Sequence, residues 1–394
     1  MRVIFPTYGG GHVKSIIPVV SQMKSIGWEP IVIGFTSSVL ELGKANVEYL
    51  ELSSFLSLYT FDEISTILSL GNKYSSISNA SLKRLEIVSY VGINLFDLLL
   101  RYDRQKVLNS YRDNGRDIFL PNDFARRVLK NLKPDAVFVS CGQRAERAFA
   151  LEALRNNIEV FRLVDLLGEN ISLENKINVF VMNEKALKNV KESNNLISNV
   201  IVTGNPNFEF EPICSSDQSE FDNLVAKHEF VVTIFTQPSV AFLSKTIELI
   251  YEEFRNNEGF LFLIKIHPNE CMSQYEKFIC DNFKVMSDID ANKVVYNSDV
   301  NLTFFSSVGF QAVNLSKPLG VLNLFNVDYP VDYVSYGIAD LISSIDDLYD
   351  LIKRTKEGVF FTSKREANYL EYAQPKNSVN NILAAMSNVF LNGA

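Results

Sequence analysis

Short apolar runs with β-strand character alternate with longer helical segments along most of this chain. Alternation of this kind predicts βαβ units, in which parallel strands are joined by helices that cover the sheet. In the first half, the expected strands are 2–6, 29–35, 46–52, 136–140, 159–164, 178–182 and 199–202, with helices over 13–26 and 143–155. In the second half, the expected strands are 230–235, 260–266, 293–296, 300–305 and 319–324, with a helix over about 240–254.

A chain of 394 residues is longer than one hydrophobic core usually supports, so we expect two domains. The predicted fold class is α/β, with two Rossmann-like domains facing a cleft. The first domain covers 1–206 and carries a helical insert over about 55–127. A polar linker over 207–228 leads to the second domain, over 229–377. A terminal helix over 378–394 is expected to pack back on the first domain.

Charge and cysteine content exclude several classes of function. With 38 basic and 46 acidic residues, the formal charge is −8, which argues against a nucleic-acid partner. The four cysteines show no metal-binding spacing, so neither a metal site nor a disulfide framework is expected. No apolar stretch is long enough for a membrane span, and the first residues do not resemble a signal peptide. We therefore expect a cytoplasmic protein, with peripheral membrane contact left open but not indicated.

Two of the three histidines follow strand-like runs. His12 comes directly after Gly9-Gly10-Gly11, and His267 lies in Lys265-Ile266-His267-Pro268. Open α/β sheets bind their ligands at the carboxyl ends of their strands, where both histidines would lie. The glycine loop precedes a helix, so its backbone N–H groups could approach an anionic ligand, or the loop could be a tight turn without one. It is not a dinucleotide fingerprint, because Lys14 stands where the third glycine is required.

The first half offers a candidate general base. The imidazole of His12 could take the proton of an acceptor hydroxyl. Asp165 and Glu169 follow another expected strand and are candidates for the acid that orients it. The sequence leaves open whether His12 or Asp165 is the base.

The second half offers a candidate phosphate site. Lys265, His267 and Pro268 follow one expected strand, and Ser306-Ser307 follow another. An imidazole and paired hydroxyls at neighbouring strand ends can bind phosphate oxygens, so a metal ion would be unnecessary. Thr236 and Gln237, after the first strand of this half, are further candidates. Asp346-Asp347 begins an expected helix and is interpreted as a cap, not a metal site.

These residues resemble motifs of GT-B glycosyltransferases, in which one domain holds the nucleotide-sugar donor and the other the acceptor. The segment 8–13 is similar to the GGH loop of MurG-type transferases, which implies an acceptor-side role for His12. His267-Pro268 and Ser306-Ser307 resemble the HP and SS motifs of bacterial sialyltransferases and Kdo transferases. Segment 306–312, with Gly309 and Gln311, is similar to their serine-to-GFEA segment. Gln311 stands where these families have a glutamate; its amide oxygen can accept a hydrogen bond from a ribose hydroxyl but carries no charge.

The resemblance implies a metal-independent, inverting glycosyltransferase of polysaccharide biosynthesis without a cofactor. It would move a sugar from a nucleotide-sugar donor, with CMP slightly favoured over UDP, to a hydroxyl of a glycan or other cell-surface acceptor. A UDP-GlcNAc 2-epimerase-like isomerase is one alternative, although the amino-terminal loop lacks the GTRPE run of that family. A polymer glycerophosphotransferase and a non-catalytic nucleotide- or glycan-binding module are the others.

Overall fold

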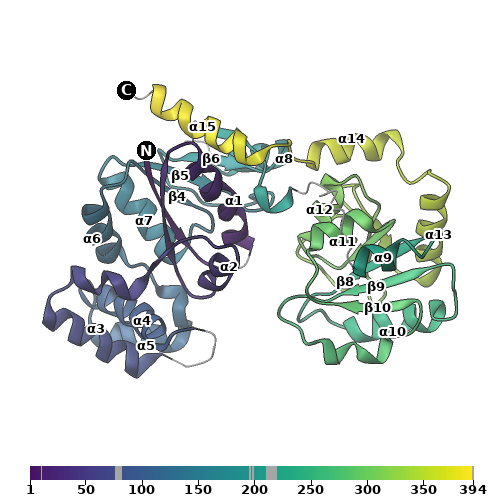
Figure 1. Cartoon of the computed structure of the whole chain (residues 1–394), viewed down its shortest axis with the longest axis horizontal. Helices are drawn as coiled ribbons and strands as arrows, with labels where there is room; N and C mark the ends of the chain where they lie inside the picture. The colour runs from purple at the N-terminus through teal and green to yellow at the C-terminus, as the bar shows by residue number, and fades with distance from the viewer. Residues whose placement is uncertain (10, 76–81, 195–196, 198, 210–219, 393–394) are drawn as a thin grey trace. The chain divides into compact units, whose positions relative to one another are not determined.

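A computed structural model describes the chain except for residues 10, 76–81, 195–196, 198, 210–219 and 393–394. The expected linker over 207–228 therefore falls partly outside the described residues, as do Gly10 of the glycine loop and Cys214. The chain divides into two compact units. The first comprises 1–207 and 375–394, and the second comprises 208–374 (Figure 1).

The first unit is built on a seven-stranded parallel sheet in the order β3-β2-β1-β4-β5-β6-β7. Its central strands are almost wholly buried, because helices cover both faces of the sheet, and this explains the continuous apolar runs. The strands are β1 (Arg2–Thr7), β2 (Glu29–Gly34), β3 (Leu50–Glu51), β4 (Ala136–Val139), β5 (Glu159–Leu163), β6 (Asn178–Val181) and β7 (Val200–Val202). The helices are α1 (Gly11–Ser25), α2 (Ser38–Lys44), α3 (Phe61–Tyr74), α4 (Arg84–Leu99), α5 (Arg104–Asn114), α6 (Asn122–Leu132), α7 (Arg144–Arg155), α8 (Glu184–Ser193) and α15 (Ser378–Asn392). The short 3-10 helices are η1 (Leu52–Leu58) and η2 (Gly115–Ile118), and η3 (Pro206–Phe208) spans the boundary between the units.

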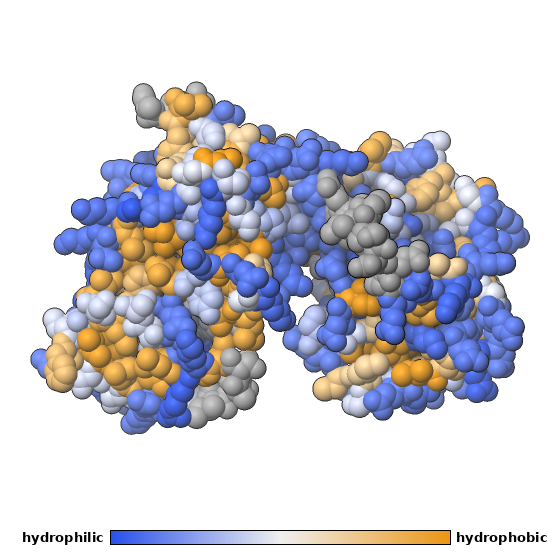
Figure 2. Space-filling model, in the orientation of Figure 1, coloured by the Kyte–Doolittle hydropathy of each residue, from blue (hydrophilic) through white to orange (hydrophobic). Residues whose placement is uncertain are grey.

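The chain between β3 and β4 is helical throughout its described regular elements. Helix α4 is apolar nearly all round, since most of its side chains are buried among α3, η1, α5 and α6. It meets α3 at Gly71 and Gly92. A Cβ added at either glycine would lie 2.0 or 2.1 Å, respectively, from a backbone oxygen of the facing helix, so the two helices pack this closely only with glycine there. Figure 2 shows hydrophobic surface on the part of this unit that carries α3, α4 and α5.

The second unit is built on a six-stranded parallel sheet in the order β10-β9-β8-β11-β12-β13. Strands β8 and β9, at its centre, are buried along their whole length. The strands are β8 (Val231–Phe235), β9 (Leu261–Lys265), β10 (Phe283–Met286), β11 (Val300–Thr303), β12 (Leu319–Leu322) and β13 (Asp340–Ile342). The helices are α9 (Glu220–Val225), α10 (Leu243–Phe254), α11 (Ala291–Asn297), α12 (Val308–Asn314), α13 (Ile345–Lys356) and α14 (Ser363–Tyr372), with 3-10 helices η4 (Met272–Gln274) and η5 (Glu276–Phe278).

The last helix, α15, belongs to the first unit although it follows the second in sequence. Figure 1 shows α1 in purple and α15 in yellow, which pack side by side. Ile382, Leu383 and Met386 of α15 lie in one buried cluster with Val13 and Ile16 of α1. The first unit therefore needs both ends of the chain for its core.

One expected strand is wrong. Segment 293–296 lies within helix α11, because the Asp290 side chain accepts hydrogen bonds from the backbone N–H groups of Asn292 and Lys293 and caps the helix. Two strands, β10 and β13, were not expected. The cap predicted at Asp346-Asp347 is confirmed, since Asp347 and Ser344 form a capping box at the start of α13.

Candidate functional site

The carboxyl edge of the second sheet carries a compact polar network around Glu270. Its carboxylate accepts hydrogen bonds from three donors: the Thr236 hydroxyl at 2.5 Å, the Tyr275 hydroxyl at 2.7 Å and the His267 backbone N–H at 3.1 Å. The His267 N–H also lies 3.1 Å from the Thr236 hydroxyl oxygen. These bonds connect the loop after β8 to the loop after β9, so the backbone that carries His267 is fixed.

The same loop determines which nitrogen of the His267 ring carries the proton. The Asn269 backbone N–H donates to Nδ1 at 3.1 Å, so Nδ1 must be the unprotonated nitrogen in this geometry. Partial burial lowers the pKa of His267 below its ordinary value, with a smaller contribution from Lys265, although Glu270 opposes the shift. The lowered pKa and the Asn269 contact both favour the neutral ring, whose Nε2–H can donate to a ligand oxygen.

The lowered pKa of His267 predicts a pH dependence of folding stability. Because the folded protein favours the neutral ring, the contribution is present above the ordinary histidine pKa and is lost as the pH falls through the folded value. Between pH 7 and about pH 5, His267→Gln should lose less stability than the wild type. Urea unfolding of both proteins across this range measures the difference, which is small because the ring is partly exposed. Equal pH dependence in the two proteins would contradict the interpretation.

Ser306 and Ser307 lie between β11 and α12. The Ser306 Oγ accepts a 3.4 Å hydrogen bond from the Val308 backbone N–H, and the Ser306 carbonyl accepts one from the Tyr333 hydroxyl at 2.7 Å. Ser307 is exposed and makes no side-chain cap. Gln311 is buried, and its Oε1 has no hydrogen-bond partner within the described chain.

Gly309 has a structural reason to be glycine. An added Cβ would lie 2.5 Å from Cζ of Tyr333, whose ring is fully buried and holds the Ser306 carbonyl. We predict that Gly309→Ala displaces the ring, destabilises the second unit by about 1–3 kcal/mol and disturbs the serine segment. Thermal unfolding measures the loss. Gly259→Ala is the control, because its added Cβ makes only a 3.4 Å contact with Asn257; equal stability losses in both variants would argue against this role of Gly309.

The sequence suggested that His267 and the two serines follow neighbouring strands, and this is wrong. Strand β8 lies between β9 and β11, so the ends of β9 and β11 are separated by two strand spacings, roughly 10 Å. Thr236 and Gln237 follow β8 and therefore lie between the two motifs. From the sequence these two residues were only further candidates. Glu270 and Tyr275 gave no sequence signal, because only the contact between the loops after β8 and β9 brings them to Thr236.

Lys265 and Pro268 have different environments from His267. The Lys265 ammonium is buried and donates to the carbonyl oxygens of Ser287, at 2.6 Å, and Ile266, at 3.2 Å. These bonds hold the Lys265 side chain against the end of β10, so it has a structural role. Pro268 is exposed in the turn after His267.

The first unit has a cavity at the carboxyl end of β1, and His12 is part of its wall. His12 lies in the first turn of α1, is half-buried, and its ring makes no hydrogen bond within the described residues. Gly9 packs closely against the start of α2, since an added Cβ would lie 2.0 Å from the Ser37 Oγ. Gly11 begins α1 and is exposed. The wall consists of Tyr8, Gly9, His12, Thr36, Ser37, Cys141, Gln143 and Arg144.

The structure does not bring Asp165 to His12. Asp165 follows β5, which is separated from β1 by β4, and its exposed carboxylate accepts a 3.1 Å hydrogen bond from the Leu166 N–H. Glu169 is also exposed, in the same loop. The buried acid of this region is Glu146, which accepts from the backbone N–H groups of Ser140, at 2.5 Å, and Cys141, at 2.8 Å. Glu146 therefore holds the loop after β4. The sequence did not single it out, because it lies within the expected helix and not after a strand.

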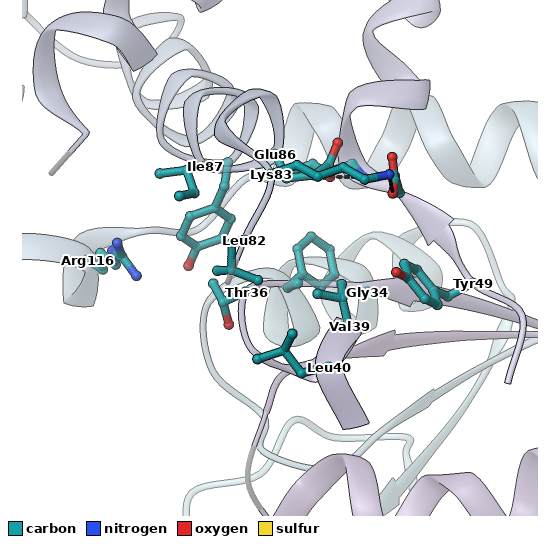
Figure 3. A pocket seen from close by; sticks show the side chains of 14 residues that line it. Gly34, Thr36, Val39, Leu40, Tyr49, Leu82, Lys83, Glu86, Ile87 and Arg116 are labelled. Carbon is teal, nitrogen blue, oxygen red and sulfur yellow. Dashed lines mark hydrogen bonds and ion pairs between the residues drawn. The ribbon is translucent and has the colours of Figure 1, made fainter. Parts of the chain in front are cut away.

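A second cavity of the first unit opens between the end of β2, the beginning of η1 and α4 (Figure 3). It shares Thr36 with the His12 cavity. The hydroxyls of Tyr8, in the His12 cavity, and Tyr90, in the second cavity, lie 3.2 Å apart. The two cavities are therefore neighbours.

The described chain offers neither a cluster of metal-binding side chains nor a membrane-spanning helix. No group of three or more histidine, cysteine or acidic side chains could hold a metal ion among these residues. Outside the undescribed segments, no helix has the length and apolar character needed to cross a membrane.

No family sequence model matches the chain, and no curated protein matches it in sequence. Solved structures match it over nearly its whole length. The S. aureus MnaA–UDP co-structure has a TM-score of 0.61 at 13% identity and covers 99% of this chain and 97% of its own. UDP-GlcNAc 2-epimerase from Neisseria meningitidis, bound to UDP-GlcNAc, has a TM-score of 0.58 at 15% identity, covering 98% and 100%. The calicheamicin glycosyltransferase CalG4 has a TM-score of 0.56 at 12% identity, covering 98% of each chain. The chain therefore has the α/β fold of GT-B glycosyltransferases, as the sequence predicted.

Proposed function

We propose that this protein is a glycosyltransferase that takes a sugar from a UDP-activated donor and transfers it to a hydroxyl group. The observation that carries the proposal is the fixed, neutral His267 ring at the carboxyl edge of the second sheet, with its Nε2–H free for a ligand oxygen. The sequence slightly favoured CMP. UDP replaces it in the proposal because two similar solved structures are described with UDP or UDP-GlcNAc.

In this proposal, the second unit binds the donor without a metal ion. The His267 Nε2–H and the hydroxyls of Ser306 and Ser307 donate to diphosphate oxygens, and neutral donors of this kind also stabilise the charge that develops on the leaving UDP. Thr236 keeps its hydroxyl bonded to Glu270 and acts by holding the His267 loop. The unpartnered Gln311 Oε1 is suited to accept a hydrogen bond from a ribose hydroxyl.

The first unit supplies the base. His12 removes the proton of the acceptor hydroxyl, and the oxygen attacks the anomeric carbon. The new carbon–oxygen bond forms as the bond to the β-phosphate oxygen breaks, so UDP leaves and the anomeric configuration inverts. We assign the base to His12 over Asp165, because His12 belongs to a cavity wall while the Asp165 carboxylate is exposed and bonded to its own loop.

A UDP-GlcNAc 2-epimerase is the second candidate. It is favoured by the epimerases among the similar solved structures. An epimerase changes the donor alone, so it has no use for an acceptor cavity. The neighbouring cavities of the first unit offer room for the acceptor that the transferase requires.

Proton NMR of UDP-GlcNAc incubated with the protein separates these reactions. The transferase predicts stable donor without acceptor, apart from slow hydrolysis, and release of UDP when an acceptor is present. Appearance of the C2 epimer without acceptor would reject the transferase in favour of the epimerase. Saturable binding of UDP-GlcNAc without turnover across an acceptor panel would indicate a binding module instead.

A further inference from the structure

The second cavity of the first unit has a largely apolar wall. Val39, Leu40, Leu52, Leu82 and Ile87 line it, and Phe35, Tyr49 and Tyr90 add aromatic rings. In Figure 3, Arg116 lies at one end of the cavity and Tyr49 at the other, with Leu82, Val39 and Leu40 between them. A cavity with this lining suits a ligand with an apolar or aromatic body.

The charged groups of the wall are not equivalent. Lys83 forms an ion pair with Glu51 at 2.5 Å. Glu86 accepts hydrogen bonds from the backbone N–H groups of Leu52, at 2.7 Å, and Ser53, at 3.1 Å. Both acids and the lysine are therefore already satisfied by the protein.

Arg116 is the exception. Its guanidinium lies over the Tyr90 ring, 5.6 Å from the ring centroid, and is partly buried. No carboxylate pairs with it within the described residues. A partly desolvated guanidinium beside an apolar wall favours an anionic partner, and its planar fork fits a carboxylate or phosphate.

We propose that this cavity binds a small molecule with an aromatic or apolar body and one anionic group, held by Arg116. Resting on the proposed function, this molecule is the acceptor. The Tyr8–Tyr90 hydroxyl contact and the shared Thr36 place the cavity directly beside the one that contains His12. A ligand anchored by its anion at Arg116 would have its apolar body in the cavity and a hydroxyl free to enter the His12 cavity.

Two naphthalene dyes of similar shape test the binding site. Fluorescence titration compares 8-anilinonaphthalene-1-sulfonate, which is anionic, with N-phenyl-1-naphthylamine, which is neutral. Arg116→Gln should weaken binding of the anionic dye by about tenfold and leave that of the neutral dye unchanged, because only the charged pair is lost. Arg112→Gln, on the exposed face of α5, is the matched control and should change neither.

A third variant locates the dyes. Leu40→Trp, which adds bulk to the cavity wall, should weaken binding of both. If Arg116→Gln leaves the anionic dye unaffected, or weakens both dyes equally, the assignment of Arg116 is overturned. If Leu40→Trp changes neither, the dyes bind elsewhere and the cavity is overturned as the site.

Failure of this inference can be told apart from failure of the proposed function. UDP titration of the same variants reports on the second unit, so Arg116→Gln should retain wild-type UDP affinity. Arg116-dependent dye binding without any UDP binding would leave the cavity in place and reject the transferase. UDP binding and turnover, together with dye binding that does not depend on Arg116, would support the transferase and reject the assignment of this cavity.

Discussion

Replacing His267 by alanine is expected to weaken UDP binding by about tenfold to a hundredfold, measured by isothermal titration calorimetry. The loss corresponds to one hydrogen bond to a charged phosphate oxygen, donated by the Nε2–H that the Asn269 contact leaves free. His267→Gln should recover part of the affinity, because its amide can still donate an N–H. The variant should fold, since the ring is only partly buried and the Glu270 network bonds to the backbone N–H of this residue.

His228→Gln is the matched control for His267. His228 belongs to the same unit and lies between α9 and the amino end of β8, not at the carboxyl ends of the strands, and its ring bonds to the Leu224 carbonyl of α9. Its replacement should leave UDP affinity unchanged. Wild-type affinity in His267→Ala would show that the phosphate is held elsewhere.

Replacing His12 by glutamine is expected to lower the rate of UDP release from UDP-sugar by about a hundredfold to ten-thousandfold, the range for removal of a general base. UDP affinity should stay at the wild-type value, because His12 belongs to the first unit and the proposed donor ligands to the second. Single-turnover measurement of UDP release, together with UDP calorimetry, separates the two effects. The fold should persist, since His12 is half-buried in the first turn of α1.

Asp165→Asn provides the comparison. If the exposed Asp165 has no part in proton transfer, this variant keeps most of the turnover. A large loss in Asp165→Asn with little change in His12→Gln would transfer the role of base to Asp165.

The strands that the sequence predicted best are the buried ones. Segments such as Val231–Phe235 and Leu261–Lys265 are apolar throughout, because both faces of the parallel sheet are covered. Strand β13 was missed because it has only three residues at the edge of the sheet, and β10 because it has only four residues with a lysine among them, too short a run to give a strand signal. Segment 293–296 is apolar enough for a strand, yet the capping residue Asp290 before it was a usable helix signal.

The site could be predicted in part. Sequence placed His12, Thr236, His267 and Ser306 after strands, where the structure has them. Their grouping depends on strand order, which placed β8 between β9 and β11 and β4 between β1 and β5. The Arg116 cavity could not be predicted, because its wall combines segments from β2, η1, α4 and η2 that are far apart in the chain.

Parallel calorimetric titrations of the wild-type protein with UDP and with CMP distinguish the two classes of donor. A UDP-sugar donor site predicts saturable binding of one UDP per chain, and weaker binding of CMP, which lacks the second phosphate. Absence of UDP binding, or tighter binding of CMP than of UDP, would contradict a UDP-sugar donor site at the carboxyl edge of the second sheet.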